Sequence, residues 1–294
     1  MLRASTPWSR ASGSSLRSDH IRDEAPDDAE RGARTHLTVQ KSWGELQKMH
    51  RACRIVVQTL ETLARAAVPG VATRELDRIA REQIVKAGAK PAFLGYRGYP
   101  ATLCISVNEE VVHGIPGDRR LKDGDVVGLD LGCVVDGFYG DAARTVGVGR
   151  VSDAARRLMN VTEDSLRAGI ERCRPGNRVG DIGHAVQAVA EAEGFSVVRE
   201  FVGHGIGTSL HEDPQVPNYG PPGRRERLVP GMCLAIEPMV NAGGPEVRVL
   251  DDGWTAVTKD GSLSAHFELS VAIMAEGPWI LSDPYPYASK EAHA

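Results

Sequence analysis

Residues 125–145, DVVGLDLGCVVDGFYGDAART, predict a β-hairpin. Two runs rich in β-branched and aromatic residues flank Asp136-Gly137, a dipeptide typical of the two-residue hairpin turn. That turn makes Val135 and Phe138 a facing pair, and the pair fixes the register of the remaining residues. The stretch therefore predicts two long antiparallel strands and indicates a fold built on an antiparallel sheet.

Two carboxylates of this hairpin fall on the same face. In the predicted register Asp130 lies opposite Ala143, and Asp141 shares a face with Ala143 because side chains alternate along a strand. Asp130 and Asp141 are then diagonal neighbours with Cα atoms about 7–8 Å apart. Carboxylates that converge from that distance repel each other unless a cation lies between them. Two solvated acids on an exposed sheet face are the alternative, although Asp is poorly suited to strands.

Three further residues with carboxylate or imidazole side chains stand in equally distinct contexts: His204 in GHGIG, Glu237 in AIEPMV and Glu268 in HFELS. With the two aspartates they offer four hard oxygen donors and one imidazole, which suit a cluster of divalent metal ions. Each also has an ordinary alternative, either a hydrogen-bonded core histidine or a salt bridge to a distant Lys or Arg. The glycines around His204 let the backbone approach closely and turn sharply.

Alternating residues predict one strand over residues 264–274. Its apolar face comprises Phe267, Leu269, Val271 and Ile273. Glu268 lies on the other face, in the middle of a half-buried strand. Glu237 follows the apolar run 232–236 and precedes Pro238, which ends ladder donation there. A carboxylate at either position needs a partner, because an unpaired buried carboxylate is costly.

The 294 residues have the composition of an ordinary globular protein, with 41% hydrophobic and 25% charged residues. A net charge of −4 argues against a nucleic-acid binder, so no DNA partner is expected. No run of about 18 apolar residues exists, so no membrane-spanning helix is expected. The odd count of five cysteines and the absence of a signal peptide predict reduced thiols in the cytoplasm. The cysteines form no CxxC pair, which argues against a four-cysteine zinc site.

The chain divides by composition into three parts. Residues 1–40 are rich in Ser, Arg, Asp and Ala without apolar periodicity, and they predict a disordered tail. An Arg- and Ser-rich targeting segment and an over-long start assignment remain alternatives for them. Residues 41–285 are expected to form a single domain of two duplicated halves, about 42–150 and 151–280, followed by a C-terminal tail at 286–294.

Two helices are predicted before the hairpin. Ser42 with Glu45 three residues later is a capping-box signature for a helix that runs to about Ala67. Thr73 is expected to cap a second helix, and Gly88 is expected to end it. The first half is therefore a pair of helices followed by strands.

The same order recurs later in the chain. Pro69-Gly70 separates the first two helices, and Pro175-Gly176 stands 106 residues further on. The glycine stop recurs as Gly194. A chance Pro-Gly match is the alternative, but the matching order of helix, break, helix and strands favours a duplicated unit. Two such halves facing each other would form a cleft, a usual location for a site.

These contexts together resemble those of the type I methionine aminopeptidases. The resemblance covers roughly residues 42–275. The segments that carry it are PGVATRELDRI, GYRGYPATLCISVNEEVVHGIPG, GDVVGLDLG, DGFYGDAARTV, GHGIGTSLHEDPQVPNYG, LAIEPMV and DGWTAVTKDGSLSAHFE, and as a set they are highly specific. The resemblance implies an α+β fold of the pseudo-two-fold "pita-bread" type, with a central curved antiparallel sheet flanked by helices.

The resemblance also implies a dinuclear metal site. Asp130 would chelate one ion, while Asp141 and Glu268 would bridge both. His204 and Glu237 would bind the other ion. The two divalent ions could be cobalt, manganese, iron, zinc or nickel, since such sites accept several first-row metals. An extra monovalent cation remains open.

The implied activity is removal of the initiator methionine from nascent polypeptides with a small second residue. Glu237 would also act as general base, His211 would donate a hydrogen bond to the oxyanion, and His113 would contact the amide nitrogen of the second residue. The methionine pocket would be lined by Tyr96, Tyr99, Cys104, Leu210 and Trp254, with Phe93 as an extra wall. The partner is the N-terminus of a nascent chain, either free or at the ribosome. A cytoplasmic monomer without a membrane partner is expected.

Three departures from the family pattern lie beside the expected ligands. His266 stands where Gln is usual, Leu269-Ser270 where His-Thr is usual, and Leu210 where an aromatic residue is usual. These changes bear on pocket shape and metal preference rather than on the ligand set. Two alternatives remain for the function. One is an aminopeptidase acting before proline, and the other is a non-catalytic binding module, which should have lost at least one of the five ligands.

Overall fold

The computed structural model describes residues 39–283 and residue 286, so most of the predicted N-terminal and C-terminal tails lies outside the described residues. The helices are α1 (Trp43–Ala66), α2 (Thr73–Lys86), α3 (Asp153–Glu171) and α4 (Val179–Ala192), with a 3₁₀ turn at η1 (Tyr96–Gly98). The strands are β1 (Lys90–Pro91), β2 (Leu103–Val107), β3 (Glu110–Val112), β4 (Val126–Val135), β5 (Phe138–Gly147), β6 (Ser196–Val197), β7 (Gly203–Gly205), β8 (Glu212–Val216), β9 (Cys233–Ile236), β10 (Met239–Asn241), β11 (Val247–Val249), β12 (Ala256–Thr258), β13 (Ser264–His266), β14 (Glu268–Met274) and β15 (Gly277–Ile280).

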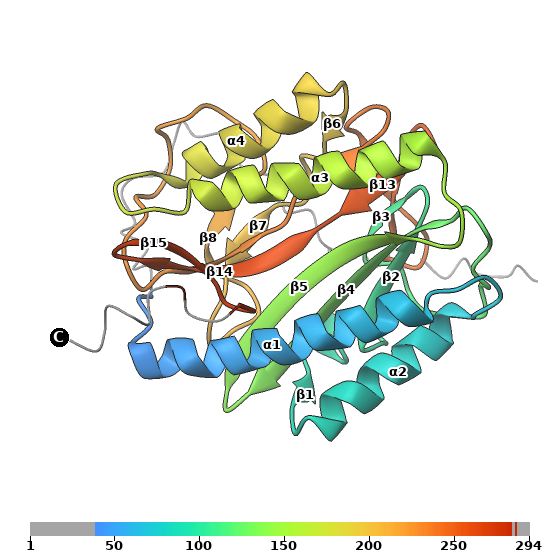
Figure 1. Ribbon diagram of the computed structural model, residues 1–294, viewed down its shortest axis with the longest axis horizontal. Helices are drawn as coiled ribbons and strands as arrows, with labels where there is room; N and C mark the ends of the chain where they lie inside the picture. Colours follow the sequence, from blue (N-terminus) through green and yellow to red (C-terminus); the bar gives the residue numbers. More distant parts are fainter. Residues whose placement is uncertain (1–38, 284–285, 287–294) are drawn as a thin grey trace, which may run out of the picture.

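A curved antiparallel sheet forms the centre of the molecule (Figure 1). Its nine strands include the path β1-β4-β5-β14-β9-β7-β8, with β2 paired to β4 and β15 paired to β14. Two three-stranded sheets, β13-β10-β6 and β11-β12-β3, accompany it. All these pairings are antiparallel. The predicted α+β fold with a central antiparallel sheet is confirmed.

The predicted hairpin is formed by β4 and β5. Its register is the expected one, with Val135 opposite Phe138 and Asp130 opposite Ala143. Both residues of the turn have positive φ angles, 49° and 81°, as a type I′ turn requires. The Asp-Gly dipeptide therefore sets the register of the two longest strands.

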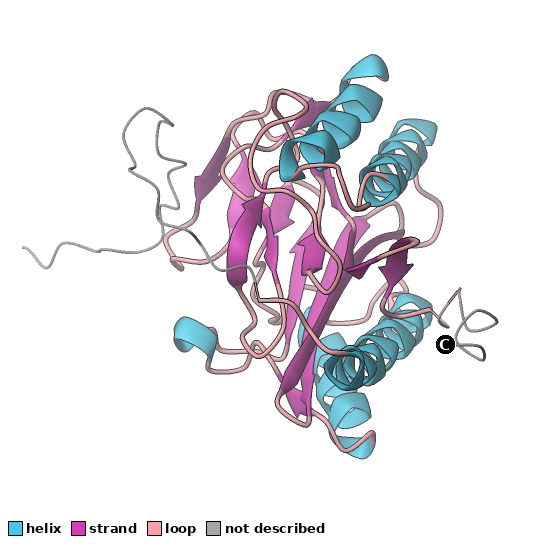
Figure 2. Ribbon diagram, turned by 90° about the vertical axis from the view of Figure 1, so that its left-hand side faces the viewer, coloured by secondary structure: helices cyan, strands magenta, loops and turns pink. Residues whose placement is uncertain are grey.

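The two helix pairs cover one face of this sheet (Figure 2). α1 packs on β4 and β5 and contacts α2, while α3 packs on α4 and on β13. Val56 and Leu63 of α1 are fully buried in one cluster with Leu131 of β4. Leu166 of α3 and Ile182 of α4 join a second cluster with the strands of the other half. Burial of a side chain of this size contributes about 1.5–3 kcal/mol, so the helices firmly close this face.

The start of α1 follows the prediction, but the start of α2 does not. The Ser42 N–H donates to the Glu45 carboxylate at 2.7 Å, as in a capping box. Thr73, however, is the first residue of α2 rather than its cap, which is Ala72. The Thr73 hydroxyl instead accepts from the Gly117 N–H at 2.8 Å. The Thr73 hydroxyl therefore bonds to a distant segment of the chain instead of capping the helix.

The helix pairs repeat one another in backbone detail. Gly70 and Gly176 both follow the Pro that separates two helices, with φ of 92° and 95°. Gly88 and Gly194, which follow the second helix of each pair, have φ of 75° and 77°. These left-handed conformations suit Gly because it has no Cβ. The repeated order is the predicted one, while the boundaries at 42–150 and 151–280 stay a prediction.

The strand predicted over residues 264–274 is two strands. β13 ends at His266, which pairs with Met239 of β10, and β14 begins at Glu268 in the central sheet. The chain changes sheets at Phe267, whose N–H donates to the Pro238 carbonyl at 3.3 Å. The expectation of a half-buried strand is also wrong, because Glu268, Ser270 and Ala272 on the other face are buried as well.

The cysteines belong to the core. All five are free and buried. Burial raises the pKa of the Cys53 thiol to about 12, so it stays protonated and inert at neutral pH. Among the described residues, no helix combines the length and the hydropathy needed to cross a membrane.

Candidate metal centre

Strand register places the acids of the two halves on one face. Asp130 pairs with Ala143, and Ala143 pairs on its other side with Glu268. Residues that pair across antiparallel strands point to the same face, so Asp130 and Glu268 project in the same direction. Asp141 lies two residues before Ala143 and shares that face. This face is opposite the helices, because Leu131 points to them.

The same register extends beyond β14. Ser270, on the face of Glu268, pairs with Ala235 of β9. Ala235 pairs in turn with His204 of β7. Glu237 lies two residues beyond Ala235, directly after β9 ends, and projects from the same face. Backbone pairing alone thus directs all five predicted ligands to one side of the sheet.

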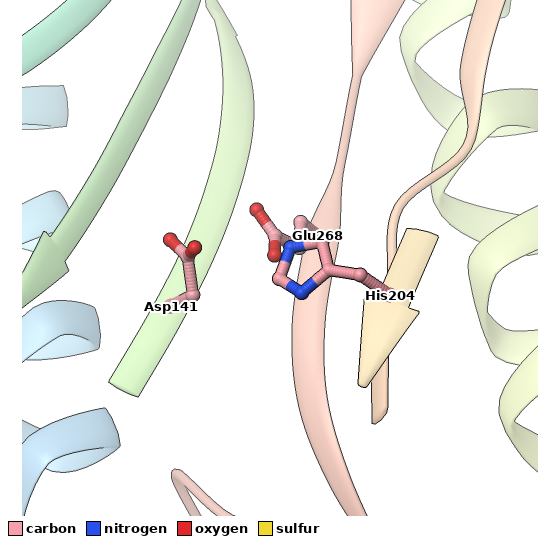
Figure 3. Close-up of side chains that lie close together, drawn as sticks. All are labelled: Asp141, His204 and Glu268. Carbon is pink, nitrogen blue, oxygen red and sulfur yellow. The ribbon is translucent and has the colours of Figure 1, made fainter. Parts of the chain in front are cut away.

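The side chains converge across the middle of the sheet. Asp141, Glu268 and His204 point toward one another from β5, β14 and β7 (Figure 3). One potential ligand atom from each lies within 4.8 Å of the other two, so the three could hold a metal ion. Glu237 joins them, since its Oε1 lies 3.4 Å from His204 Nε2.

The four carboxylates disfavour one another's charge. Burial raises the pKa of Asp130 to about 7. Burial, followed by the charge of Asp130, raises the pKa of Asp141 and of Glu237 well above the usual range. Burial, followed by the charges of Asp141 and Glu237, does the same to the pKa of Glu268. A bound cation would remove this repulsion.

Several carboxylate oxygens lack a partner. Asp130 Oδ1, Asp141 Oδ1 and Glu268 Oε1 are covered from solvent and have no hydrogen bond within the part of the chain described. Among the described residues, no Lys or Arg pairs with Glu237 or Glu268, so the salt-bridge alternative fails there. Covered carboxylate oxygens beside an imidazole are the donor set that divalent metal ions take. The residues present therefore fit a divalent metal.

His204 is held in the form that a ligand needs. Its Nδ1 lies 2.9 Å from the Gly205 carbonyl, which only accepts, so Nδ1 carries the proton. Nε2 then presents a lone pair toward Glu237. Burial lowers the pKa of His204 to about 3, so the ring is neutral at pH 7. A neutral imidazole with a fixed tautomer is a good metal ligand.

The glycines on either side of His204 are required by close packing. A Cβ on Gly203 would collide with the Ala235 carbonyl, and one on Gly205 would collide with the Asp213 carbonyl. The predicted close approach of the backbone is confirmed at both positions. It lets β7 lie between β8 and β9 while it carries His204.

A cleft of about 410 Å³ opens on this face. Its lining includes all six residues predicted for the methionine pocket: Phe93, Tyr96, Tyr99, Cys104, Leu210 and Trp254. The same six pack as one apolar cluster. Tyr99 turns its polar end away, with its hydroxyl donating to the Gly114 carbonyl at 2.9 Å. Phe93 is buried in this cluster and also lines the cleft, so it belongs both to the core and to the cleft wall.

Two more histidines border the cleft. His211 stacks on Tyr96, whose hydroxyl lies 2.8 Å from His211 Nδ1, and its ring centroid is 4.2 Å from that of His204. His113 meets Phe201 edge-on at 5.3 Å. Burial, followed by the charge of His211, lowers the pKa of His113 to about 4. His113 is therefore neutral at pH 7.

The sequence did not single out Phe201 and Met239, which also line the cleft. Met239 reaches it from β10, a strand of only three residues, and Phe201 lies outside any strand. No local pattern marks either residue. His266, noted only as a departure from a family pattern, lies with Nε2 at 3.8 Å from Glu237 Oε2. That nitrogen is covered and has no hydrogen-bond partner among the described residues.

Residues 47–274 match metallopeptidase family M24. The chain belongs to this family. It is 54% identical to a methionine aminopeptidase of Clostridium perfringens over 84% of the chain and 99% of the relative. It is 52% identical to methionine aminopeptidase 1 of Bacillus subtilis, again over 84% of the chain and 99% of the relative.

Solved structures of related proteins have the same fold. A methionine aminopeptidase from Thermotoga maritima superposes with a TM-score of 0.83 and 45% identity, covering 84% of this chain and 100% of its own. A prolidase from Pyrococcus furiosus, at a TM-score of 0.68 and 21% identity, shares the fold. The predicted pita-bread fold and the predicted resemblance are confirmed, and membership of a metallopeptidase family implies use of a divalent metal.

Proposed function

We propose that this chain is a methionine aminopeptidase, which hydrolyses the first peptide bond of polypeptides that begin with methionine. The observation that carries the proposal is the convergence of three acids, Asp141, Glu237 and Glu268, with His204 in a cleft that also holds His113 and His211. Asp130 lies on the same face of the sheet, one strand further along. The names of relatives at 52% and 54% identity support the same activity. A small second residue in the substrate is part of the proposal.

The order of the strands supports an assignment of metal ligands. Asp141 and Glu268 lie on the two central strands, β5 and β14, and would bridge two ions. Asp130 on β4 would complete the site on one side. His204 on β7 and Glu237 after β9 would complete it on the other. When bound, two such ions lower the pKa of a water molecule and polarise the carbonyl of the substrate. This donor set accepts cobalt, manganese, iron, zinc or nickel.

Glu237 is the acid best placed to move a proton. Its side chain keeps 14% of its exposure, and its two oxygens face His204 and His266. It would accept a proton from the attacking water and return it to the leaving amine, which is general base and then general acid catalysis.

The two cleft histidines would act on the peptide bond itself. Tyr96 fixes the Nδ1 side of His211, so the other ring nitrogen would donate to the carbonyl oxygen as negative charge develops. Such a donor is typically worth about 2.7–4 kcal/mol in the transition state. His113, neutral and held by Phe201, would contact the amide nitrogen of the second residue and assist its departure.

The apolar cluster would select methionine. Tyr99 and Trp254 meet edge to face at 5.1 Å, and with Leu210 and Cys104 they form walls suited to a long, polarisable thioether. The unbranched chain of methionine fits a narrow apolar slot better than a polar or branched side chain does. The proposed partner is the N-terminus of a nascent polypeptide, free or at the ribosome. We also propose that the protein acts as a monomer in the cytoplasm.

The test is an assay of two tripeptides, Met-Ala-Ser and Ala-Pro-Ala. The protein is first stripped of metal with a chelator and then given Mn²⁺, Co²⁺ or Fe²⁺. We expect release of methionine from Met-Ala-Ser and no cleavage of Ala-Pro-Ala. Cleavage of Ala-Pro-Ala alone would replace the proposal with an aminopeptidase acting before proline. Metal binding without cleavage of either peptide would replace it with a binding module. Metal titration followed by elemental analysis should give two divalent ions per chain.

A further inference from the structure

Lys41 is a buried lysine beside the cleft that none of the steps above uses. Its side chain is only 3% exposed, and Nζ lies 2.5 Å from Glu212 Oε2. It also donates to the Val39 carbonyl at 3.3 Å. The two charged residues are 171 positions apart, and Lys41 precedes the segment that matches the family, residues 47–274. A buried charge pair across such a separation calls for an explanation, because desolvating two charges is costly.

Glu212 organises the loop that carries His211. Its other oxygen, Oε1, accepts from the Thr208 N–H at 2.7 Å and from the Ser209 N–H at 3.1 Å. The carboxylate therefore closes residues 207–212 into a compact loop, and Leu210 and His211 lie inside it. Lys41 neutralises that carboxylate from the other side.

The backbone on both sides of the Lys41–Glu212 pair is held close to it. A Cβ on Gly207 would collide with the Lys41 side chain and would lie 2.7 Å from Glu212 Oε1. The Gly207 carbonyl accepts from the Tyr139 N–H at 2.8 Å, which ties the loop to β5. The Lys41 N–H donates to the Gly231 carbonyl at 2.7 Å, which fixes the lysine itself. Both ends of the Lys41–Glu212 contact are thus anchored.

We propose that Lys41 is a positioning residue for catalysis: its ammonium group holds Glu212, and Glu212 holds residues 207–212 so that His211 faces the carbonyl of the substrate. This inference rests on the proposed function for the role of His211. The claim about the loop itself does not depend on that role. Simple stabilisation is the competing explanation, and the two differ in what they predict for turnover.

The experiment uses the full chain with Lys41→Met, Glu212→Gln and the double variant. Arg51→Met is the matched control, because Arg51 pairs with Asp136 at 2.5 Å but both side chains are more than half exposed (52% and 60%). Lys41→Met should lower kcat for Met-Ala-Ser by about 10–100-fold, the usual cost of removing a group that orients an active-site residue. Metal affinity should change less than about twofold, since none of the proposed ligands lies in residues 207–212. Arg51→Met should leave kcat unchanged.

Hydrogen exchange supplies a readout that needs no activity. In Lys41→Met the amides of Thr208 and Ser209 should exchange faster, while those of β4 and β5 keep their protection. The double variant restores charge balance, so it should recover thermal stability but not kcat. Lys41→Arg keeps the charge and should recover most of the lost kcat.

Three outcomes would overturn the proposal. The first is unchanged exchange at residues 207–212 in Lys41→Met. The second is faster exchange there with unchanged kcat. The third is a double variant that recovers stability and kcat together, because the pair would then act through stability alone. If Lys41→Met does not fold, Glu212→Gln carries the same measurements, since it breaks the same ion pair from the other side. If the wild-type chain cleaves no peptide, the proposed function fails, and the exchange data still decide whether Lys41 holds the loop.

Discussion

The two halves of the central sheet supply their acids in different ways. β4 and β5 pair over ten consecutive residues, and they carry Asp130 and Asp141 in a single local register. The other half places His204 on a strand of three residues, Glu237 after a strand of four, and Glu268 at the first position of β14. The first pair of ligands is fixed by one turn. The other three depend on contacts between distant segments, so they should be easier to displace.

The largest expected effect is at Glu237. Glu237→Gln keeps the volume of the side chain but removes its charge and its ability to accept a proton. We expect kcat/KM for Met-Ala-Ser to fall by about 10²–10⁴, the range that general acid–base catalysis supplies. Metal-free protein at pH 8 should become more stable, because one of four mutually repelling acids is gone. Peptide assays and thermal melts of chelated protein measure the two effects.

Asp136→Asn is the matched control on the other half. It changes an exposed acid in the turn between β4 and β5, and Asn also tolerates the positive φ found there. It should leave kcat/KM unchanged. Wild-type turnover by Glu237→Gln would contradict the assignment of Glu237 as the base.

The next effect concerns His211, on the loop that Lys41 and Glu212 hold. His211→Ala should lower kcat by about 10²–10³, the usual cost of losing one donor to an oxyanion. Metal affinity, measured by calorimetry, should stay within about twofold because His211 is not among the proposed ligands. A loss of metal binding that matches the loss of rate would instead make His211 a ligand. Tyr96→Phe removes the hydroxyl on His211 Nδ1 and should give a smaller loss in the same direction.

The contrast between the halves also explains what the sequence could predict. The Asp-Gly turn and the alternation after it were sufficient to pair Val135 with Phe138 and to place Asp130 and Asp141 on one face. The same alternation over residues 264–274 predicted one strand, but the chain changes sheets at Phe267. That change arises because residue 266 pairs with β10 rather than with the central sheet, and no local pattern records such a pairing.

The site shows the same limit. The composition of the five predicted ligands pointed to a metal, and the family resemblance supplied their roles. Neither could show that Ala143 and Ala235 link the ligands through the ladder, or that Phe201 and Met239 line the cleft. The contact between Lys41 and Glu212 is equally invisible, since an isolated Lys before a helix carries no signal. All three features depend on pairings between residues that are far apart in the sequence. Bringing such residues together costs loop-closure entropy, and no local sequence pattern records the pairing.

Two matched core substitutions test whether the first half is the more robust scaffold. Leu131 of β4 and Leu234 of β9 are both fully buried on the helix side of the sheet. Leu131→Ala and Leu234→Ala should each lower the free energy of unfolding by about 2–5 kcal/mol in urea titrations. Activity should separate them. Leu234→Ala should lower kcat more, because β9 offers only four residues to hold Glu237 in place. Equal losses of kcat would show that both halves position their ligands equally well.

The smallest expected effect is a fall of a few degrees in the melting temperature of metal-free protein between pH 7 and pH 8. Asp130, Asp141, Glu237 and Glu268 have pKa values in the folded state that are raised above their ordinary values by burial and mutual repulsion, to about 7 for Asp130. The unfolded chain has released these protons by pH 7, so it binds fewer protons than the folded chain. Stability from these groups is therefore fully present below their unfolded pKa and is lost as pH rises through the folded pKa.

The pH window isolates the acids from the other buried groups. His113, His204 and His266 have folded pKa values lowered to about 4, 3 and 3, so their contribution is lost only as pH falls below their ordinary pKa of about 6.5. The cysteine thiols affect the pH dependence of stability only from about pH 9, their ordinary pKa. Glu268→Gln should flatten the slope between pH 7 and pH 8, and Mn²⁺ should abolish it while protons are released. A melting temperature that rises over this window would mean that the acids of the two halves do not repel one another. Their convergence would then not be what makes this face a metal site.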